Sequence, residues 1–168
     1  MRFSRVLRIQ YIEIKNMFKT REDKEEFIEN LDGAMKVLHY RFHVFDGGCV
    51  YVAALLADGL EQLNIPFDVV IYEHPHEGKN LTPEQLASQG DICHVAISVT
   101  IGRKSIELGG EIASQLMDKE NVTKSIHHMS SQELMDIYDN YEWNGEYDIQ
   151  DNDNVKNEIE LDFQALLM

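Results

Sequence analysis

The chain has 168 residues, 43% of them apolar, and this length fits one domain with a single buried core, which we expect to span residues 1–168. Its formal net charge is -15, so its surface repels phosphate backbones, which excludes a general nucleic-acid binder. No apolar run approaches the roughly 18 residues of a membrane helix, and the first residues lack the apolar centre of a secretory signal, so we expect a cytoplasmic protein that does not bind membranes.

The N-terminal part of the chain contains two predicted segments. Residues 5–15 are rich in β-branched and aromatic types with partial alternation, which fits a strand and a short amphipathic arm equally well. Residues 21–40 have apolar side chains at spacings of three and four, and acidic side chains near their start suit the helix dipole. The second segment is therefore predicted to be a surface helix with one buried stripe.

A second helix is predicted to begin in the segment 46–49, Asp-Gly-Gly-Cys. Asp46 can cap free backbone amides, and the two glycines allow the chain to turn tightly into the helix. Cys49 lies in the first turn and shares one face with four later apolar residues, Ala53, Leu56, Leu60 and Leu63. Pro66 ends the helix, because proline disfavours helical geometry in the residue before it. The thiol of Cys49 should therefore face the core at the helix N-terminus.

The middle of the chain is predicted to form strands. Residues 67–72 indicate a buried strand, residues 73–79 a loop and residues 82–88 a short capped helix. Residues 93–100 alternate, with His94 on one face and Val95 on the other, and Gly102 turns the chain into a hairpin partner at 104–108. Helices are expected again at 130–141 and 154–167. This mixture of helices and an antiparallel hairpin predicts the α+β fold class.

Three of these positions are candidates for nucleophilic catalysis. A cysteine at a helix N-terminus lies where the dipole and free amides favour a thiolate and can hold an oxyanion. It also needs a proton acceptor, which in turn needs an orienting group. We expect the hairpin to bring His94 and Glu107 side by side for these roles. Taken singly, Cys49 is also typical of a small buried hydrophobe, His94 of a core histidine, and Glu107 of a solvated strand end.

This order of residues resembles the transglutaminase-like branch of the papain-like cysteine hydrolases. The resemblance spans residues 46–110 and rests on two stretches, GGCVYVAALLADGLEQLNIPFDVV and HVAISVTIGRKSIELGG. It implies a papain-like fold without a cofactor, in which a nucleophile helix packs on a small antiparallel sheet. It further implies that Cys49 is the nucleophile, His94 the base and acid, and Glu107 the orienting carboxylate. That family usually has aspartate where Glu107 stands and glycine where Asn64 stands.

The resemblance implies a thiol-dependent hydrolase or acyltransferase acting on an amide bond of a peptide, a protein or a small molecule. The alternative is a catalytically impaired papain-like fold that serves as a protein-binding module. In that case the acidic C-terminal region is a candidate surface for a basic protein partner, because aromatic side chains among acidic ones can anchor such a partner. These aromatics are Tyr138, Tyr141, Trp143 and Tyr147. The competing interpretation is that they complete the core.

The seven histidines also suggest a metal site. His39 and His43 have the i, i+4 spacing that can chelate zinc on a helix, but the glutamate of an HExxH motif is missing. The other pairs, His74 with His76 and His127 with His128, lack nearby cysteine or acidic ligands. Two cysteines are too few for a disulfide framework, and their spacing excludes a CxxC motif. We therefore expect neither a metal nor another cofactor.

Overall fold

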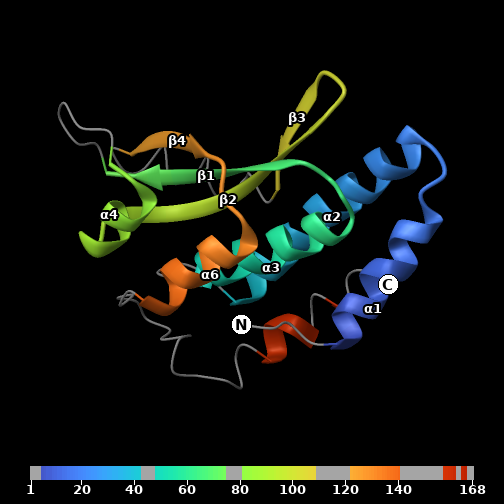
Figure 1. Ribbon diagram of the computed structural model, residues 1–168, viewed down its shortest axis with the longest axis horizontal. Coiled ribbons are helices and arrows are strands. Elements are labelled where there is room, and N and C mark those ends of the chain that lie inside the picture. Colours follow the sequence, from blue (N-terminus) through green and yellow to red (C-terminus); the bar gives the residue numbers. More distant parts are fainter. Residues whose placement is uncertain are drawn as a thin grey trace.

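The computed structural model describes residues 5–42, 48–74, 81–108, 122–140, 157–161 and 164–165. Its helices and strands, in chain order, are α1 (Arg5–Met17), α2 (Arg21–Phe42), α3 (Gly48–Gln62), β1 (Phe67–Glu73), α4 (Pro83–Ser88), β2 (Ile92–Ile101), β3 (Lys104–Glu107), β4 (Thr123–His127) and α6 (Ser131–Asn140). Residues 157–161 and 164–165, within the helix predicted at 154–167, are also helical. The strands form one curled antiparallel sheet, and α3 and α6 lie together on one side of it (Figure 1). The predicted α+β class is confirmed.

The sheet has the strand order β3-β2-β1-β4. Apolar residues that alternate along β1 and β2 pack into the main core with α3, namely Val69, Ile71, Val95, Ile97 and Val99. The residues between them point to the other face, because successive side chains of a strand alternate. There Val70, Tyr72 and Ala96 form a second, smaller apolar cluster with Val122. Both faces of the two central strands are therefore covered by apolar packing.

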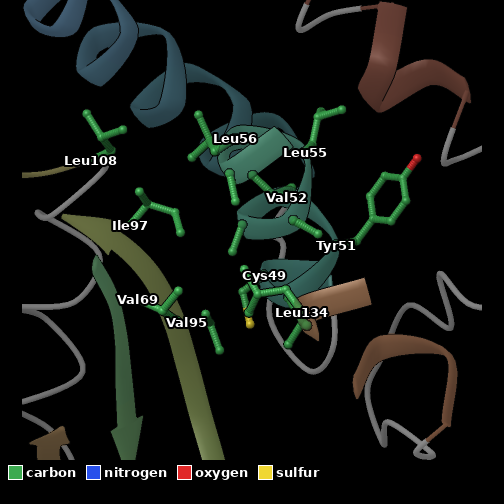
Figure 2. Close-up of a cluster of buried hydrophobic side chains, with 14 of the residues drawn as sticks. Cys49, Tyr51, Val52, Leu55, Leu56, Val69, Val95, Ile97, Leu108 and Leu134 are labelled. Atoms are coloured by element: carbon green, nitrogen blue, oxygen red, sulfur yellow. The ribbon is translucent and has the colours of Figure 1, made fainter. Parts of the chain in front are cut away.

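Helix α3 is the central helix of the fold. Every residue from Cys49 to Ala57 is buried, although the spacing in the sequence predicted only one buried face. The helix packs against β2 and α6 (Figure 2). Side chains of α2 belong to the same cluster. A helix that is apolar on all sides is stable only when it is surrounded by protein. The position of α3 follows from that composition.

Two elements differ from the sequence prediction. Residues 5–17 form helix α1, so the strand interpretation of this segment is wrong. Ile14 of this helix packs against the main core, and the side chain of Gln10 donates a hydrogen bond to the backbone carbonyl of Gln164 at 3.0 Å. Strand β4 was not predicted. Among the described strands it pairs only with β1, at the edge of the sheet, and its one aliphatic side chain, Ile126, is 62% exposed.

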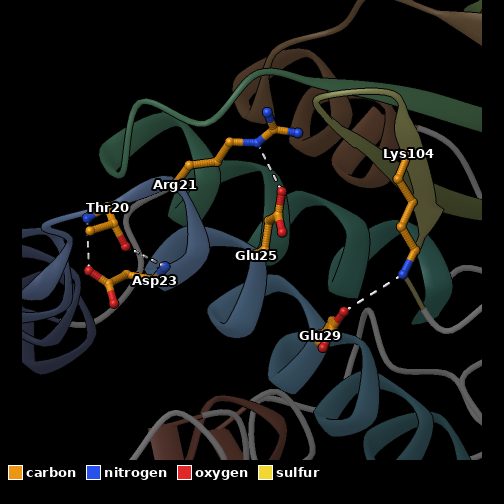
Figure 3. Close-up of polar contacts among 6 residues, drawn as sticks. All are labelled: Thr20, Arg21, Asp23, Glu25, Glu29 and Lys104. Carbon is orange, nitrogen blue, oxygen red and sulfur yellow. Dashed lines mark hydrogen bonds and ion pairs between the residues drawn. The ribbon is translucent and has the colours of Figure 1, made fainter.

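The start of α2 is capped by its own first residues. The side chain of Asp23 accepts the backbone amides of Lys19 and Thr20, each at 2.8 Å. The hydroxyl of Thr20 in turn accepts the amide of Asp23 at 3.2 Å, and Figure 3 shows this reciprocal pair of Thr20 and Asp23. These two backbone amides hold the pKa of the Asp23 carboxyl below its usual range. The reciprocal bonds satisfy amides that a helix N-terminus leaves open.

Charged side chains lie where the β2–β3 hairpin approaches α2. Gly102 occupies the turn with a φ of 63°, in the left-handed region, and the Arg21 guanidinium lies so close over it that a Cβ atom there would clash. Arg21 also pairs with Glu25 at 2.9 Å, and Lys104 of the hairpin approaches Glu29 of α2 at 3.6 Å (Figure 3). The predicted turn at Gly102 is confirmed, with Ile101 opposite Lys104.

Asn64 ends α3 in a left-handed conformation. Its φ is 55°, its amide donates to the carbonyl of Glu61 at 3.1 Å, and the amide of Ile65 donates to the carbonyl of Leu60 at 2.9 Å. This pair of bonds is the Schellman arrangement, in which glycine or asparagine is favoured at the left-handed residue. The geometry explains why asparagine can stand where the resembled family usually has glycine.

Asn64→Ala is expected to lower the free energy of unfolding by about 1 kcal/mol, because a Cβ without a local hydrogen-bonding group is strained at positive φ. Asn64→Gly should retain the stability of the native chain. Urea denaturation measures both, with Asn16→Ala in the exposed part of α1 as the control for a helical asparagine. Equal stability of Asn64→Ala and Asn64→Gly would contradict this account.

Candidate active site

Cys49 lies in the first turn of α3, as the sequence predicts. The helix begins at Gly48, and the side chain of Cys49 is 2% exposed within the main core, in the same cluster as Val69, Val95 and Leu134 (Figure 2). The expected capping residue, Asp46, lies outside the described residues. The helix N-terminus favours a thiolate at this position, whereas the apolar surroundings oppose one.

His94 lies near the start of β2 and is 1% exposed. It stands directly opposite Tyr72 of β1, and their ring centroids are 6.0 Å apart with the planes tilted by 43°. The next residue along β2, Val95, belongs to the cluster that contains Cys49. Strand alternation therefore turns Val95 toward α3 and turns the imidazole of His94 toward Tyr72. The imidazole of His94 therefore lies on the opposite face of β2 from the cluster that contains Cys49, and the expected pairing of the two side chains is not seen among the described contacts.

Glu107 lies at the end of β3, opposite Ser98. Ser98 is four residues beyond His94 on β2, so the hairpin does not set Glu107 side by side with His94 as expected. The carboxylate instead accepts a hydrogen bond from the hydroxyl of Tyr72 at 2.5 Å, and Lys124 of β4 approaches its other oxygen at 3.4 Å. Glu107 is therefore connected to the His94 region through Tyr72.

Tyr72 is the residue that sequence reasoning missed at this site. Its side chain is buried between His94 and Glu107, and its pKa is raised well above the usual value, first by burial and then by the hydrogen bond and negative charge of Glu107. The hydroxyl consequently stays protonated and acts as a donor. The sequence places Tyr72 at the end of the first buried strand. It does not show which residues Tyr72 contacts, because these depend on how strands that lie far apart in the sequence pair with each other.

The remaining candidate residues lie elsewhere. Tyr138 of α6 is buried and packs on Tyr51 with centroids 5.5 Å apart, while residues 141–150, with the other C-terminal aromatics, lie outside the described residues. His128 contacts Asp68 at 2.7 Å, and His127 contacts Ser125 at 2.8 Å. His43 and His76 and the side chain of His39 are not described. Among the described residues, no group of three or more His, Cys, Asp or Glu side chains could hold a metal ion.

Comparisons with known proteins give no relative from which the role of this site could be inferred. Neither the known protein families, nor the curated proteins, nor the solved structures contain a match to this chain. Within the described ranges, no helix combines the length and the apolar character needed to cross a bilayer.

Proposed function

We propose that this chain is a thiol-dependent hydrolase or acyltransferase that acts on an amide bond, built on the papain-like, transglutaminase-like plan. The observation that carries the proposal is the position of Cys49. It lies in the first turn of a central, buried helix, where the positive end of the helix dipole favours a thiolate. The order of nucleophile helix, strand, histidine strand and hairpin also agrees with the resemblance in sequence.

In the proposed reaction, His94 takes the proton of the Cys49 thiol as the sulfur attacks the carbonyl carbon of the amide. The backbone amide of Cys49 helps to stabilise the oxyanion of the tetrahedral intermediate. The protonated His94 then gives its proton to the leaving amine, which departs as the C–N bond breaks and leaves a thioester on Cys49. Water or a second amine attacks the thioester and restores the thiol.

This mechanism requires an imidazole nitrogen of His94 within hydrogen-bond reach of the Cys49 sulfur. The structure places the imidazole on the face of β2 away from the Cys49 cluster, so the proposed proton transfer requires this end of the sheet to rearrange when the substrate binds. The apolar neighbours of Cys49 exclude water from the same region, which strengthens electrostatic interactions during the reaction.

The second candidate is a catalytically impaired papain-like fold that acts as a protein-binding module. It is favoured by one specific observation, that the imidazole of His94 packs against Tyr72 while Glu107 is engaged by Tyr72 and Lys124. The acidic composition of the chain would then suit a basic protein partner. The two candidates differ in whether Cys49 reacts.

The experiment uses the full chain with Cys93→Ser, so that Cys49 is the one remaining thiol. Release of ammonia from glutamine side chains, incorporation of a fluorescent primary amine into casein and cleavage of peptide anilides are measured before and after treatment with iodoacetamide. We expect an activity that alkylation of Cys49 abolishes. Activity that survives complete alkylation, or a Cys49 that resists alkylation in the folded chain, would overturn the proposal.

A further inference from the structure

We propose that the pocket between the start of α2 and the tip of the β2–β3 hairpin binds a small organic anion, a phosphate monoester or a carboxylate that carries an apolar group. The pocket has a volume of about 370 Å³, which is within the range of small-molecule sites. Three cationic side chains from both elements line it, namely Arg21, Arg103 and Lys104. None of its lining residues belongs to the candidate active site, so the proposal does not depend on the proposed function.

The tight turn of the hairpin brings two of these cations to one place. Gly102 takes the positive φ at the first position of a two-residue turn, so Arg103 and Lys104 follow directly at the tip. The two terminal nitrogens of the Arg21 guanidinium lie over Gly102, while its hydrogen bond to Glu25 uses Nε. The turn and the first residue of α2 therefore hold three cationic side chains around one pocket.

The pocket differs in the sign of its charge from the chain as a whole. Its three cations face two carboxylates, Glu25 and Glu29, so its lining has a small positive formal charge, whereas the chain carries -15. A strongly acidic surface repels small anions, and a local excess of cations attracts them. Among the described parts of the molecule, this pocket is therefore a place where an anion gains from the local charge.

The two glutamates leave the cations free to contact a ligand. The pairs Arg21–Glu25 and Lys104–Glu29 are exposed, and exposed pairs contribute little to stability (Figure 3). The Lys104 ammonium lies 3.6 Å from its carboxylate, which is beyond ordinary hydrogen-bond length. Among the described acidic side chains, none forms an ion pair with Arg103. An incoming anion therefore finds one unpaired guanidinium and two weakly held cations.

The donors and the apolar part of the lining indicate the class of ligand. A guanidinium presents parallel N–H donors that match two oxygens of a phosphate or a carboxylate. Ile101 and Ile106, which are partly buried and pack against the main core, line the same pocket. A bare inorganic anion would leave these side chains in water, whereas a ligand with an apolar group would cover them and gain from their burial.

The test titrates the full chain with phenyl phosphate, benzoate, inorganic phosphate and phenol at about 0.15 M salt, where charges farther apart than about 8 Å are screened. Binding is followed by the NMR shift of the backbone amide of Gly102, which lies under Arg21. Phenyl phosphate or benzoate should shift this amide with a dissociation constant of about 1 mM. That is about tenfold tighter than inorganic phosphate, and phenol should leave the amide unchanged. The tighter of the two organic anions identifies the charged group of the ligand.

Variants of the chain separate this pocket from the general charge of the molecule. Arg103→Ala should weaken binding of the preferred anion about tenfold, whereas Lys36→Ala, on α2 outside the pocket, should change it by less than about twofold. Glu29→Gln should strengthen binding, because it removes a competing carboxylate, and Glu26→Gln on the same helix should have little effect. No saturable shift of Gly102 with either organic anion, binding no tighter than that of phenol, or equal effects of Arg103→Ala and Lys36→Ala would overturn the proposal.

Discussion

Cys49→Ala is expected to abolish the turnover of amide substrates, with a loss of roughly 10³-fold or more, as expected when the nucleophile of a covalent mechanism is removed. The thiol is the group that forms the acyl intermediate, and no hydroxyl or amine replaces it in the alanine variant. The fold should remain, because alanine is a smaller side chain that suits both the helix and the apolar cluster around this position. Amine incorporation and anilide cleavage measure the loss, and circular dichroism checks the fold.

Cys93→Ala is the matched control for this prediction. Cys93 lies on β2 beside His94, is partly exposed and belongs to the opposite cluster from Cys49. Its removal should leave turnover within a factor of about two, in keeping with the small effects of substitutions away from a reacting group. Undiminished turnover by Cys49→Ala, or a loss in Cys93→Ala equal to that in Cys49→Ala, would show that Cys49 is not the nucleophile.

The second large effect concerns the central helix. Leu55→Ala should lower the free energy of unfolding by about 2–5 kcal/mol, because it removes a side chain that is 0% exposed and leaves a cavity that close packing cannot fill. Such a loss is a large part of the roughly 5–15 kcal/mol that stabilises a typical domain. Urea denaturation monitored by circular dichroism gives the difference.

Val37→Ala supplies the comparison, since Val37 is on α2 and 44% exposed. Its removal should change stability by less than about 1 kcal/mol. If Leu55→Ala is no more destabilising than Val37→Ala, α3 is not the buried centre of the fold.

Much of the fold could be predicted from local patterns. The helices α2, α3 and α6 and the strands β1, β2 and β3 appear within a few residues of their expected ranges, because apolar spacing, capping residues and proline act locally. Strand β4 could not be found this way, since an edge strand with one exposed aliphatic residue has no buried face to create alternation. In α1 the β-branched residues left a strand and a short amphipathic arm equally open, and the structure has a helix whose Ile14 packs against the core.

The sequence predicts which residues are candidates for the site, but not which of their side chains contact one another. The first-turn position of Cys49 and the position of His94 on a strand both follow from sequence. The two-residue turn at Gly102 then sets Glu107 opposite Ser98, and the contact of Tyr72 with both residues depends on the pairing of β1 with β2 across the intervening α4 segment. Local sequence cannot specify that pairing, because it is fixed by burial of the whole strand.

The most direct test of the account is the alkylation rate of Cys49 against pH in the native chain with Cys93→Ser, compared with the same chain carrying His94→Ala. Reactivity should rise with a midpoint well below the reference thiol value of about 8.5, and it should be lost without His94. A midpoint near the reference value that is indifferent to His94, or an unreactive Cys49, would contradict the catalytic pair and favour the protein-binding module.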